Sequence, residues 1–249
     1  YVQEQYPNLA MTGSLKALPF VKNYHFVQAP YHRSWELSAN VSANKNRGQA
    51  LTTPKNRLTR YNRRIANPSR ATLALMYLDH YIGGDILSNT VKSIPKGSLS
   101  NAVFKQELTR KTDKPLDWFF DHYIHLDNNV DLKLQGKKIN AEISRIHINS
   151  TNSKVAIPIK KILTNGTQQT AWILSNDLPY EQDYKNAEIS SLTINKNHYI
   201  PERQLNNNTY QLGNGLFRNN LKLRFLQDIA ENGTALLLYR PEFAYNYYD

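Results

Sequence analysis

The stretch KPLDWFFDHYI, Lys114–Ile124, decides how the rest of the sequence is interpreted. Pro115 suits the first turn of a helix, and the apolar residues that follow recur at helical spacing. These residues are Leu116, Phe119, Phe120, Tyr123 and Ile124. They predict a buried helix face, with Trp118 outside that stripe and packed on a neighbouring helix or on a β unit. Asp117 and Asp121 fall on the opposite side, where solvent contact is favoured over a catalytic pair.

The segment before this stretch is predicted to form short helices with tight connections. The apolar face of the first is expected at Ala71, Ala74, Leu75, Leu78, Tyr81 and Ile82. Ser69 is its expected N-cap, and Gly83-Gly84 is its expected end. A second helix is expected from Asp85 to about Ser93, and a third after a cap at Ser98 or Ser100. Together they predict a helical bundle or superhelix.

After Asp127 the hydrophobic period changes from 3.6 to 2, which predicts strands. The alternating sets are Val130, Leu132 and Leu134; Ile139, Ala141 and Ile143; Val155, Ile157 and Ile159; and Ile189, Leu192 and Ile194. Asn165-Gly166, between two such runs, is a strong hairpin signal. The fold class predicted is α+β: a helical bundle or superhelix followed by a small, antiparallel, β-sandwich-like unit.

Two domains are predicted, with the boundary where the period changes. Residues 1–127 form the helical domain, and residues 128–249 form a β-rich domain. The second domain is expected to end in a helix from Asn219 to Glu231 and a Tyr-rich tail, EFAYNYYD.

The chain is strongly basic, with a formal net charge of +11 and a pI near 9.6. Its densest basic segment is KNRLTRYNRR, Lys55–Arg64, with Tyr61 between the cations. Such a patch can bind nucleic acid. No zinc-finger, RNP-type or Gly-rich phosphate motif accompanies it, so a solvated basic surface facing a cell envelope is favoured and nucleic-acid binding is disfavoured.

Cysteine is absent, which excludes disulfides, thiolate nucleophiles and Cys-based zinc sites. The cytosol and a bacterial periplasm are both compatible with that composition. No apolar run approaches the roughly 18–20 residues that a membrane span needs, and no secretion signal is recognisable. The chain opens at Tyr1 without Met, so we expect a processed product or a fragment.

The sequence contains no established catalytic constellation. H-E-x-x-H, G-x-S-x-G, the P-loop and G-x-G-x-x-G are all missing. His122 and His125 are three residues apart and could share a metal, but a surface position is favoured for such a pair. Asp79-His80 and Glu36 are isolated, with no nucleophile or base within sequence reach.

Five segments together resemble the C-terminal region of M1-family (gluzincin) metallopeptidases, of the Bacteroidetes type that is associated with the outer membrane. They are YVQEQYP (1–7), RATLALMYLDHYIGGD (70–85), PLDWFFDHYI (115–124), NKNHYIPERQLNNN (195–208) and PEFAYNYYD (241–249). Their order along more than two hundred residues carries the resemblance, because each motif alone is only moderately specific.

The resemblance implies zinc as cofactor, although the family's zinc ligands and its general-base Glu would lie upstream of Tyr1, so this chain is predicted to contribute no metal ligand. The family also has a Tyr that stabilises the oxyanion. Alignment on LALMYL puts Pro68 at that position, and Arg70 where a Lys is common. Tyr61 is the fallback candidate. Loss of the phenol would indicate a degenerate, non-catalytic member, a pseudoenzyme.

Three functions follow as expectations. The first is a part of an M1-like protein that is inert alone and acts as cleft wall or scaffold. The second is part of an active aminopeptidase acting on peptides, with its H-E-x-x-H half upstream. The third is an accessory subunit that binds outer-membrane partners. The resemblance implies a location in the cell envelope, either periplasmic or associated with the outer membrane.

Overall fold

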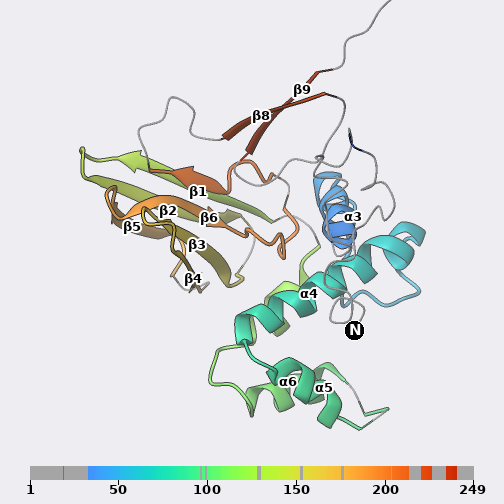
Figure 1. Ribbon diagram of the computed structural model, residues 1–249. Coiled ribbons are helices and arrows are strands. Elements are labelled where there is room, and N and C mark those ends of the chain that lie inside the picture. The colour runs from blue at the N-terminus through green and yellow to red at the C-terminus, as the bar shows by residue number, and fades with distance from the viewer. Residues whose placement is uncertain are drawn as a thin grey trace, which may run out of the picture. The chain divides into compact units, whose positions relative to one another are not determined.

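The computed structural model describes residue 19 and residues 33–95, 97–98, 100–127, 130–151, 154–174, 177–202, 204–212, 220–225 and 234–239. The chain forms two compact units, Ser34–Gly213 and a second one with Tyr1–Arg33 and Asn214–Asp249. The fold class is α+β, as predicted: the larger unit contains helices and two antiparallel sheets (Figure 1). No helix in the described ranges is both long and apolar enough to cross a bilayer.

The helical elements precede the sheets. They are α3 (Arg33–Asn44), the π-helical turn η2 (Asn62–Ala66), α4 (Asn67–Ile82), α5 (Ile86–Ser93), α6 (Asn101–Thr109), the π-helical turn η3 (Trp118–His122) and the 3₁₀ turn η4 (Tyr123–His125). Ser100 caps α6 by accepting a hydrogen bond from the Val103 amide, which confirms one of the two predicted caps. The helix predicted from Asp85 to Ser93 is also confirmed, with Asp85 as N-cap.

Helix α4 begins earlier than predicted, and its buried face agrees with the prediction at Ala74, Leu78, Tyr81 and Ile82 but not at Ala71 and Leu75. It continues directly from η2, so Ser69 is not an N-cap; its hydroxyl donates to the Ile65 carbonyl at 2.8 Å within the helix. Leu75 is 47% exposed and Ala71 is also exposed, against the prediction. The buried stripe is Leu73, Ala74, Tyr77, Leu78, Tyr81 and Ile82. The buried face is shifted toward Leu73 and Tyr77 because the large ring of Tyr77 has aromatic partners inside the unit.

Those partners form what we call the aromatic seam: Tyr77, Tyr81, Trp118, Phe119, Tyr123, Trp172 and Tyr199. Ring centroids of Tyr77 lie 4.7 Å from Trp118 and 5.1 Å from Tyr123. Tyr81 lies 4.9 Å from Trp172. Offset and edge-on arrangements at these distances are favourable for aromatic pairs. The predicted packing of Trp118 on a neighbouring helix is therefore confirmed.

The opening stretch is not a regular α-helix. The Tyr123 amide donates to the carbonyls of Phe119 and Trp118, four and five residues back, and the second of these bonds is that of a π-helix. This wider turn separates consecutive side chains by a smaller angle than an α-helix does. Trp118, Phe119 and Phe120 are consequently all buried, at 3–6% exposure. The predicted burial is confirmed for the stripe except Ile124, which is partly exposed.

The strands of the larger unit form two antiparallel sheets (Figure 1). One has the order β1-β2-β5, with β1 (Asp131–Lys138), β2 (Ile143–Thr151) and β5 (Tyr180–Lys185). The other has the order β4-β3-β6-β7, with β4 (Gln168–Ile173), β3 (Ile157–Leu163), β6 (Ile189–Ile194) and β7 (Thr209–Gln211). The Leu134 amide of β1 donates to the Asn207 carbonyl beside β7, which ties the sheets together.

Local turn chemistry explains which strand predictions hold. Asn165-Gly166 forms the β3–β4 hairpin, with Gly166 at a φ of 84°, as predicted. Ile139 and Ala141 do not belong to a strand, and Ile139 is 48% exposed. The Asn140 carboxamide oxygen accepts the Glu142 and Ile143 amides, so a polar turn between β1 and β2 overrides the apolar alternation.

Helices and sheets share one core. A single buried cluster runs from Tyr77 and Leu108 through Trp118 to Ile146, Ile157 and Leu192. The boundary predicted between residues 127 and 128 marks the change from helix to strand. It lies inside one compact unit, Ser34–Gly213. Between the sheets, the Tyr210 ring covers the Cα of Gly136 so closely that a Cβ there would overlap the ring.

The second unit contains a parallel pair of strands, β8 (Asn220–Phe225) and β9 (Thr234–Tyr239). The helix predicted from Asn219 to Glu231 is therefore wrong over Asn220–Phe225. The sequence NLKLRF alternates apolar and polar residues at a period of 2, and its partner strand is supplied from further along the chain. The Tyr-rich tail and residues 226–231 lie outside the described residues.

Candidate functional site

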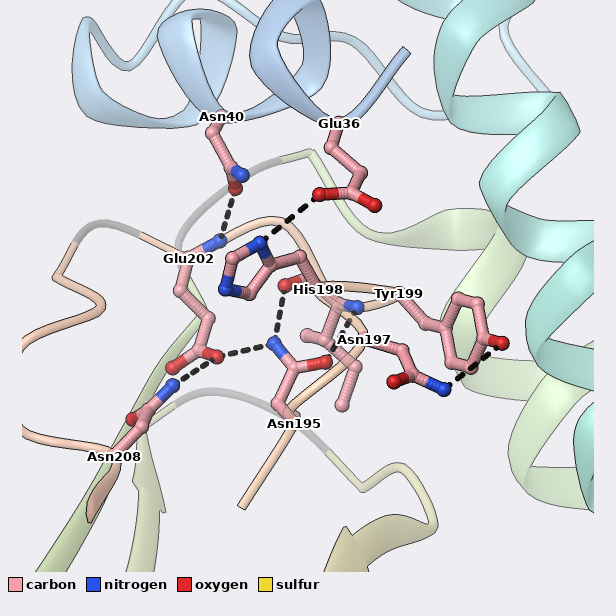
Figure 2. Close-up of polar contacts among 9 residues, drawn as sticks. Glu36, Asn40, Asn195, Asn197, His198, Tyr199, Glu202 and Asn208 are labelled. Atoms are coloured by element: carbon pink, nitrogen blue, oxygen red, sulfur yellow. Dashed lines mark hydrogen bonds and ion pairs between the residues drawn. The ribbon is translucent and has the colours of Figure 1, made fainter. Parts of the chain in front are cut away.

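A group of buried polar side chains lies where α3 meets the turn after β6 (Figure 2). We call it the buried polar cluster; its members are Glu36 and Asn40 of α3 together with Asn195, His198, Glu202 and Asn208. Each is at most 8% exposed. Buried polar groups are costly unless they are hydrogen-bonded, so their partners determine what the cluster can do.

Asn195 shapes the turn. It follows the last residue of β6 and adopts a φ of 46°, a left-handed conformation that Asn tolerates better than most residues. Its carboxamide accepts the Ile200 amide at 3.1 Å and donates to the Ile200 carbonyl at 2.7 Å. His198 also has a positive φ, 53°, and its amide donates to the Asn195 carbonyl. The Asn195 side chain thus binds both backbone groups of Ile200 and connects the two ends of the turn.

The carboxyl group of Glu202 contacts Asn195 of that turn and is the acceptor in three hydrogen bonds. Asn195 and Asn208 donate their side-chain amides to Oε1, the latter at 2.7 Å, and the Leu132 backbone amide donates to Oε2 at 3.0 Å. Burial raises the pKa of Glu202 to about 8, while the donors from Asn195, Asn208 and Leu132 oppose that rise. The carboxyl group therefore holds a proton more tightly than it would in an unfolded chain.

Helix α3 joins the cluster through two contacts. Glu36 Oε2 lies 3.1 Å from His198 Nδ1, and Asn40 Oδ1 accepts the Glu202 amide at 3.4 Å. Glu36, which looked isolated in the sequence, has its partner 162 residues away. Figure 2 shows both α3 side chains pointing down onto the turn.

The chemistry available to this cluster is limited by its enclosure. A carboxylate beside an imidazole resembles a general-base pair, but Glu36 and His198 are only 4% and 2% exposed. A substrate has no access to atoms at that depth. What the geometry does provide is a fixed backbone from Asn195 to Glu202, attached to α3, to β1 and to Asn208 just before β7.

The residues aligned with the family's oxyanion donor take structural positions. Pro68 lies in the first turn of α4, and the fallback candidate Tyr61 precedes η2 and is half-buried. The guanidinium of Arg70 is buried and donates to the carbonyls of Gln49 at 2.5 Å and Leu126 at 2.6 Å. Burial lowers the pKa of Arg70 from its ordinary value. Tyr61 and Arg70 are not brought into the buried polar cluster.

The other candidates lie apart from one another. His125 is exposed and its Nδ1 lies 3.1 Å from the Thr52 hydroxyl, while His122 is partly buried in η3. Asp117 and Asp121 both pair with Lys105, at 2.9 and 3.1 Å. Within the described ranges, no group of three or more His, Cys, Asp or Glu side chains is arranged to hold a metal ion.

A shallow groove of about 680 Å³ opens beside β5 and the β3–β4 hairpin. Lys161 lies over the Tyr184 ring at 5.0 Å, and Asp183 pairs with Arg145 at 2.7 Å. Lys185 pairs with Glu188. The charges along this groove are thus largely compensated by neighbours, which leaves it without a marked preference for either sign.

Sequence reasoning missed Asn195, His198 and Glu202 as a group. The available signal was NKNHYIPE after a strand, where a non-Gly turn rich in Asn indicates left-handed residues. Nothing local pointed to Glu36 or Asn208 as partners. No protein-family model matches the chain, and no curated protein is similar enough to count as a match.

Proposed function

We propose that this chain is the non-zinc-binding C-terminal part of an M1 aminopeptidase-like protein of the cell envelope, and that it acts as a scaffold or a wall of a peptide cleft. It is inert alone. Zinc chemistry, where the complete protein has it, is supplied by residues other than those described here.

The observation that supports this proposal is the convergence of the motifs that carry the family resemblance. Tyr77 of the 70–85 motif packs on Trp118 of the 115–124 motif. The Tyr123 hydroxyl of the second motif donates to the Tyr199 carbonyl of the 195–208 motif at 2.7 Å. Segments separated by more than seventy residues thus form one packed core, which is what a shared fold requires of its marker residues.

The roles of these residues agree with a scaffold. Aromatic rings, the buried guanidinium of Arg70 and the buried polar cluster all fix the backbone. The Arg70 guanidinium donates to backbone carbonyls, and the Glu202 carboxyl group accepts amide donors inside the unit. A wall built this way presents an invariant surface, because side chains behind it cannot change rotamer without breaking several contacts.

Metal analysis and peptidase assays of the purified full chain test the proposal. We expect substoichiometric zinc after dialysis against a zinc buffer, and no hydrolysis of a panel of aminoacyl anilides. Stoichiometric zinc that survives dialysis, or turnover that increases with chain concentration, would contradict it. A H-E-x-x-H segment found in the same gene would instead support the active-aminopeptidase alternative.

A second candidate, an accessory subunit at the outer membrane, is favoured by one surface. Residues 45–64 contain seven cations and no acidic residue: Lys45, Arg47, Lys55, Arg57, Arg60, Arg63 and Arg64. All seven are exposed. Co-sedimentation with anionic but not neutral vesicles would support this function, and equal retention on both would contradict it.

A further inference from the structure

A small pocket lies between the end of α4 and the outer face of the β3–β4 pair. Its volume is about 110 Å³, and its walls are His80, Pro158, Lys160, Thr170, Lys196 and Asn197. Liquid water occupies about 30 Å³ per molecule, so the pocket has room for roughly three to four waters. A tetrahedral oxyanion with five heavy atoms is a comparable size.

Strand register explains why these side chains converge. Lys160 pairs directly with Thr170, and Pro158 pairs with Trp172. Residues two apart on a strand share a face, so all four lie on one side of the sheet. That side is opposite to Ile157 and Ile159, which are buried in the core. The ring of His80 from α4 lies 5.4 Å from the Trp172 ring on this same side.

The remaining wall is the tip of the turn that the buried polar cluster holds. Lys196 and Asn197 lie between Asn195 and His198, whose backbones are fixed by the hydrogen bonds described above. The Asn195 amide also donates to the Pro158 carbonyl at 3.0 Å. The Asn197 carboxamide donates to the Tyr199 hydroxyl at 3.1 Å, and the Tyr199 ring lies 5.6 Å from His80. The tip is thus positioned rather than loosely exposed.

The charge of the pocket is one-sided. Lys160 and Lys196 contribute two cations, while none of the lining residues is acidic. Neither lysine forms an ion pair or a hydrogen bond with another described residue. The nearby charges that act on His80 are Asp79 and Lys114, and burial is the main reason that the pKa of His80 is lowered. Thr170, Asn197 and His80 add neutral polar groups that can donate hydrogen bonds.

We propose that this pocket is a binding site for a tetrahedral oxyanion, either free phosphate or the phosphoryl group of a small molecule. Lysine binds phosphate as a point charge, and the two lysines approach from different elements, β3 and the turn after β6. The site does not depend on the family assignment and goes beyond a scaffold function.

Titration of the full chain with inorganic phosphate, followed by NMR at constant ionic strength, tests the proposal. We expect saturable shifts of the His80 and Thr170 signals. Sulfate should compete, and acetate, which is planar and singly charged, should not. Phenyl phosphate distinguishes the two sources: tighter binding than inorganic phosphate indicates a phosphoryl group carried by an organic molecule, and weaker binding indicates the free anion.

Variants decide whether the named lysines are responsible. Lys160→Gln and Lys196→Gln should each weaken phosphate binding about tenfold, as the loss of a charge-assisted hydrogen bond does. Both side chains are at least partly exposed, so the variants should fold, with unchanged melting midpoints. Lys133→Gln, an exposed strand lysine outside the pocket, is the matched control and should bind as the wild type does.

Binding must also act on His80 by linkage, because an anion beside an imidazole favours its charged form. Phosphate at a concentration that saturates the wild type but not Lys160→Gln should therefore raise the pKa of His80 more in the wild type than in that variant. An absence of saturation, equal weakening in Lys133→Gln, or acetate binding as tight as phosphate binding would overturn the proposal.

Discussion

The aromatic seam and the buried polar cluster both stabilise the unit Ser34–Gly213, but they do so by different physical means. The seam buries large rings whose contacts are numerous, weakly directional and individually small. The cluster buries amides, carboxyl groups and an imidazole whose contacts are few and directional. A seam residue can be replaced by another of similar volume, whereas a cluster residue leaves unsatisfied partners when it is changed.

The difference also separates what each region contributes to function. The seam joins helices to sheets and so sets the overall fold. The cluster fixes the backbone of one turn, Asn195–Glu202, and through it the positions of Lys196 and Asn197. The seam thus contributes mainly to the free energy of folding. The cluster contributes mainly to the local backbone geometry at the surface.

The largest effect should come from Phe120, a buried ring that packs on the seam residue Phe119. Phe120 is 6% exposed and packs 5.2 Å from Phe119 and 5.9 Å from Phe104, between ring centroids. Phe120→Ala should lower the free energy of unfolding by about 3–5 kcal/mol. Chemical denaturation measures this change. Leu75→Ala on α4 is the control; Leu75 is 47% exposed, so about 0.5 kcal/mol or less is expected. Equal losses would mean that the buried face of α4 is assigned wrongly.

The polar side should respond almost as strongly to a smaller change. Asn195→Ala removes the hydrogen bonds to Ile200 and Glu202 and places Ala at a positive φ. We expect a loss of about 2–4 kcal/mol, from left-handed strain and unsatisfied groups together. Asn197→Ala, two residues away at the exposed tip, should cost less than about 1 kcal/mol. Denaturation curves of the two variants that coincide would refute the special role of Asn195.

The protonation of Glu202 distinguishes the two regions by pH. Its ordinary pKa of 4.5 rises to about 8 in the folded state, so the native protein binds the proton more tightly than the unfolded chain. Stability from this group is complete below about pH 4.5 and is lost as the pH rises through 8, by about 1.4 kcal/mol per pH unit.

Urea denaturation between pH 5 and 8, in wild type and Glu202→Gln, measures that slope. His80, whose pKa is lowered, acts in the opposite direction near its ordinary value, and the difference between the two proteins cancels it. Glu202→Gln should be less stable at pH 5, where its amide opposes the Leu132 donor, and should lack the extra slope. Parallel curves would show that Glu202 does not titrate in this range.

The smallest effect should come from one hydrogen bond between the seam residue Tyr123 and the backbone of the turn Asn195–Glu202. The buried Tyr123 hydroxyl donates to the Tyr199 carbonyl, and burial raises its pKa. Tyr123→Phe should cost about 1 kcal/mol, the net value of one hydrogen bond. Tyr61→Phe, which removes a half-buried hydroxyl outside both regions, should change the thermal midpoint little. A larger loss of stability in Tyr61→Phe than in Tyr123→Phe would show that the Tyr61 hydroxyl makes a stabilising contact.

The sequence predicted the features that depend on neighbouring residues. Ser100 as a cap, Asn165-Gly166 as a hairpin and the burial of Phe119 and Phe120 all follow from spacing within a few positions. The exact buried face of α4 does not follow from such spacing, because it depends on Tyr77 packing on Trp118, a residue of another element. Glu36 and His198 are separated by 162 residues, so no local pattern could pair them. The Tyr-rich tail, the zinc chemistry and the family assignment stay predictions.

Because η3 is a π-helical turn, the number of residues in this segment matters in a way that its composition does not show. Trp118–His122 holds one residue more than an α-helical turn would accommodate between the same ends. Deleting a single residue there would let the segment close as a regular α-helix between the same ends, and consecutive side chains would then be separated by about 100°, more than in the π-helical turn. The large rings of Trp118, Phe119 and Phe120, which are all buried, would no longer share one face. We therefore expect natural variants of this segment to change aromatic identity more freely than they change length.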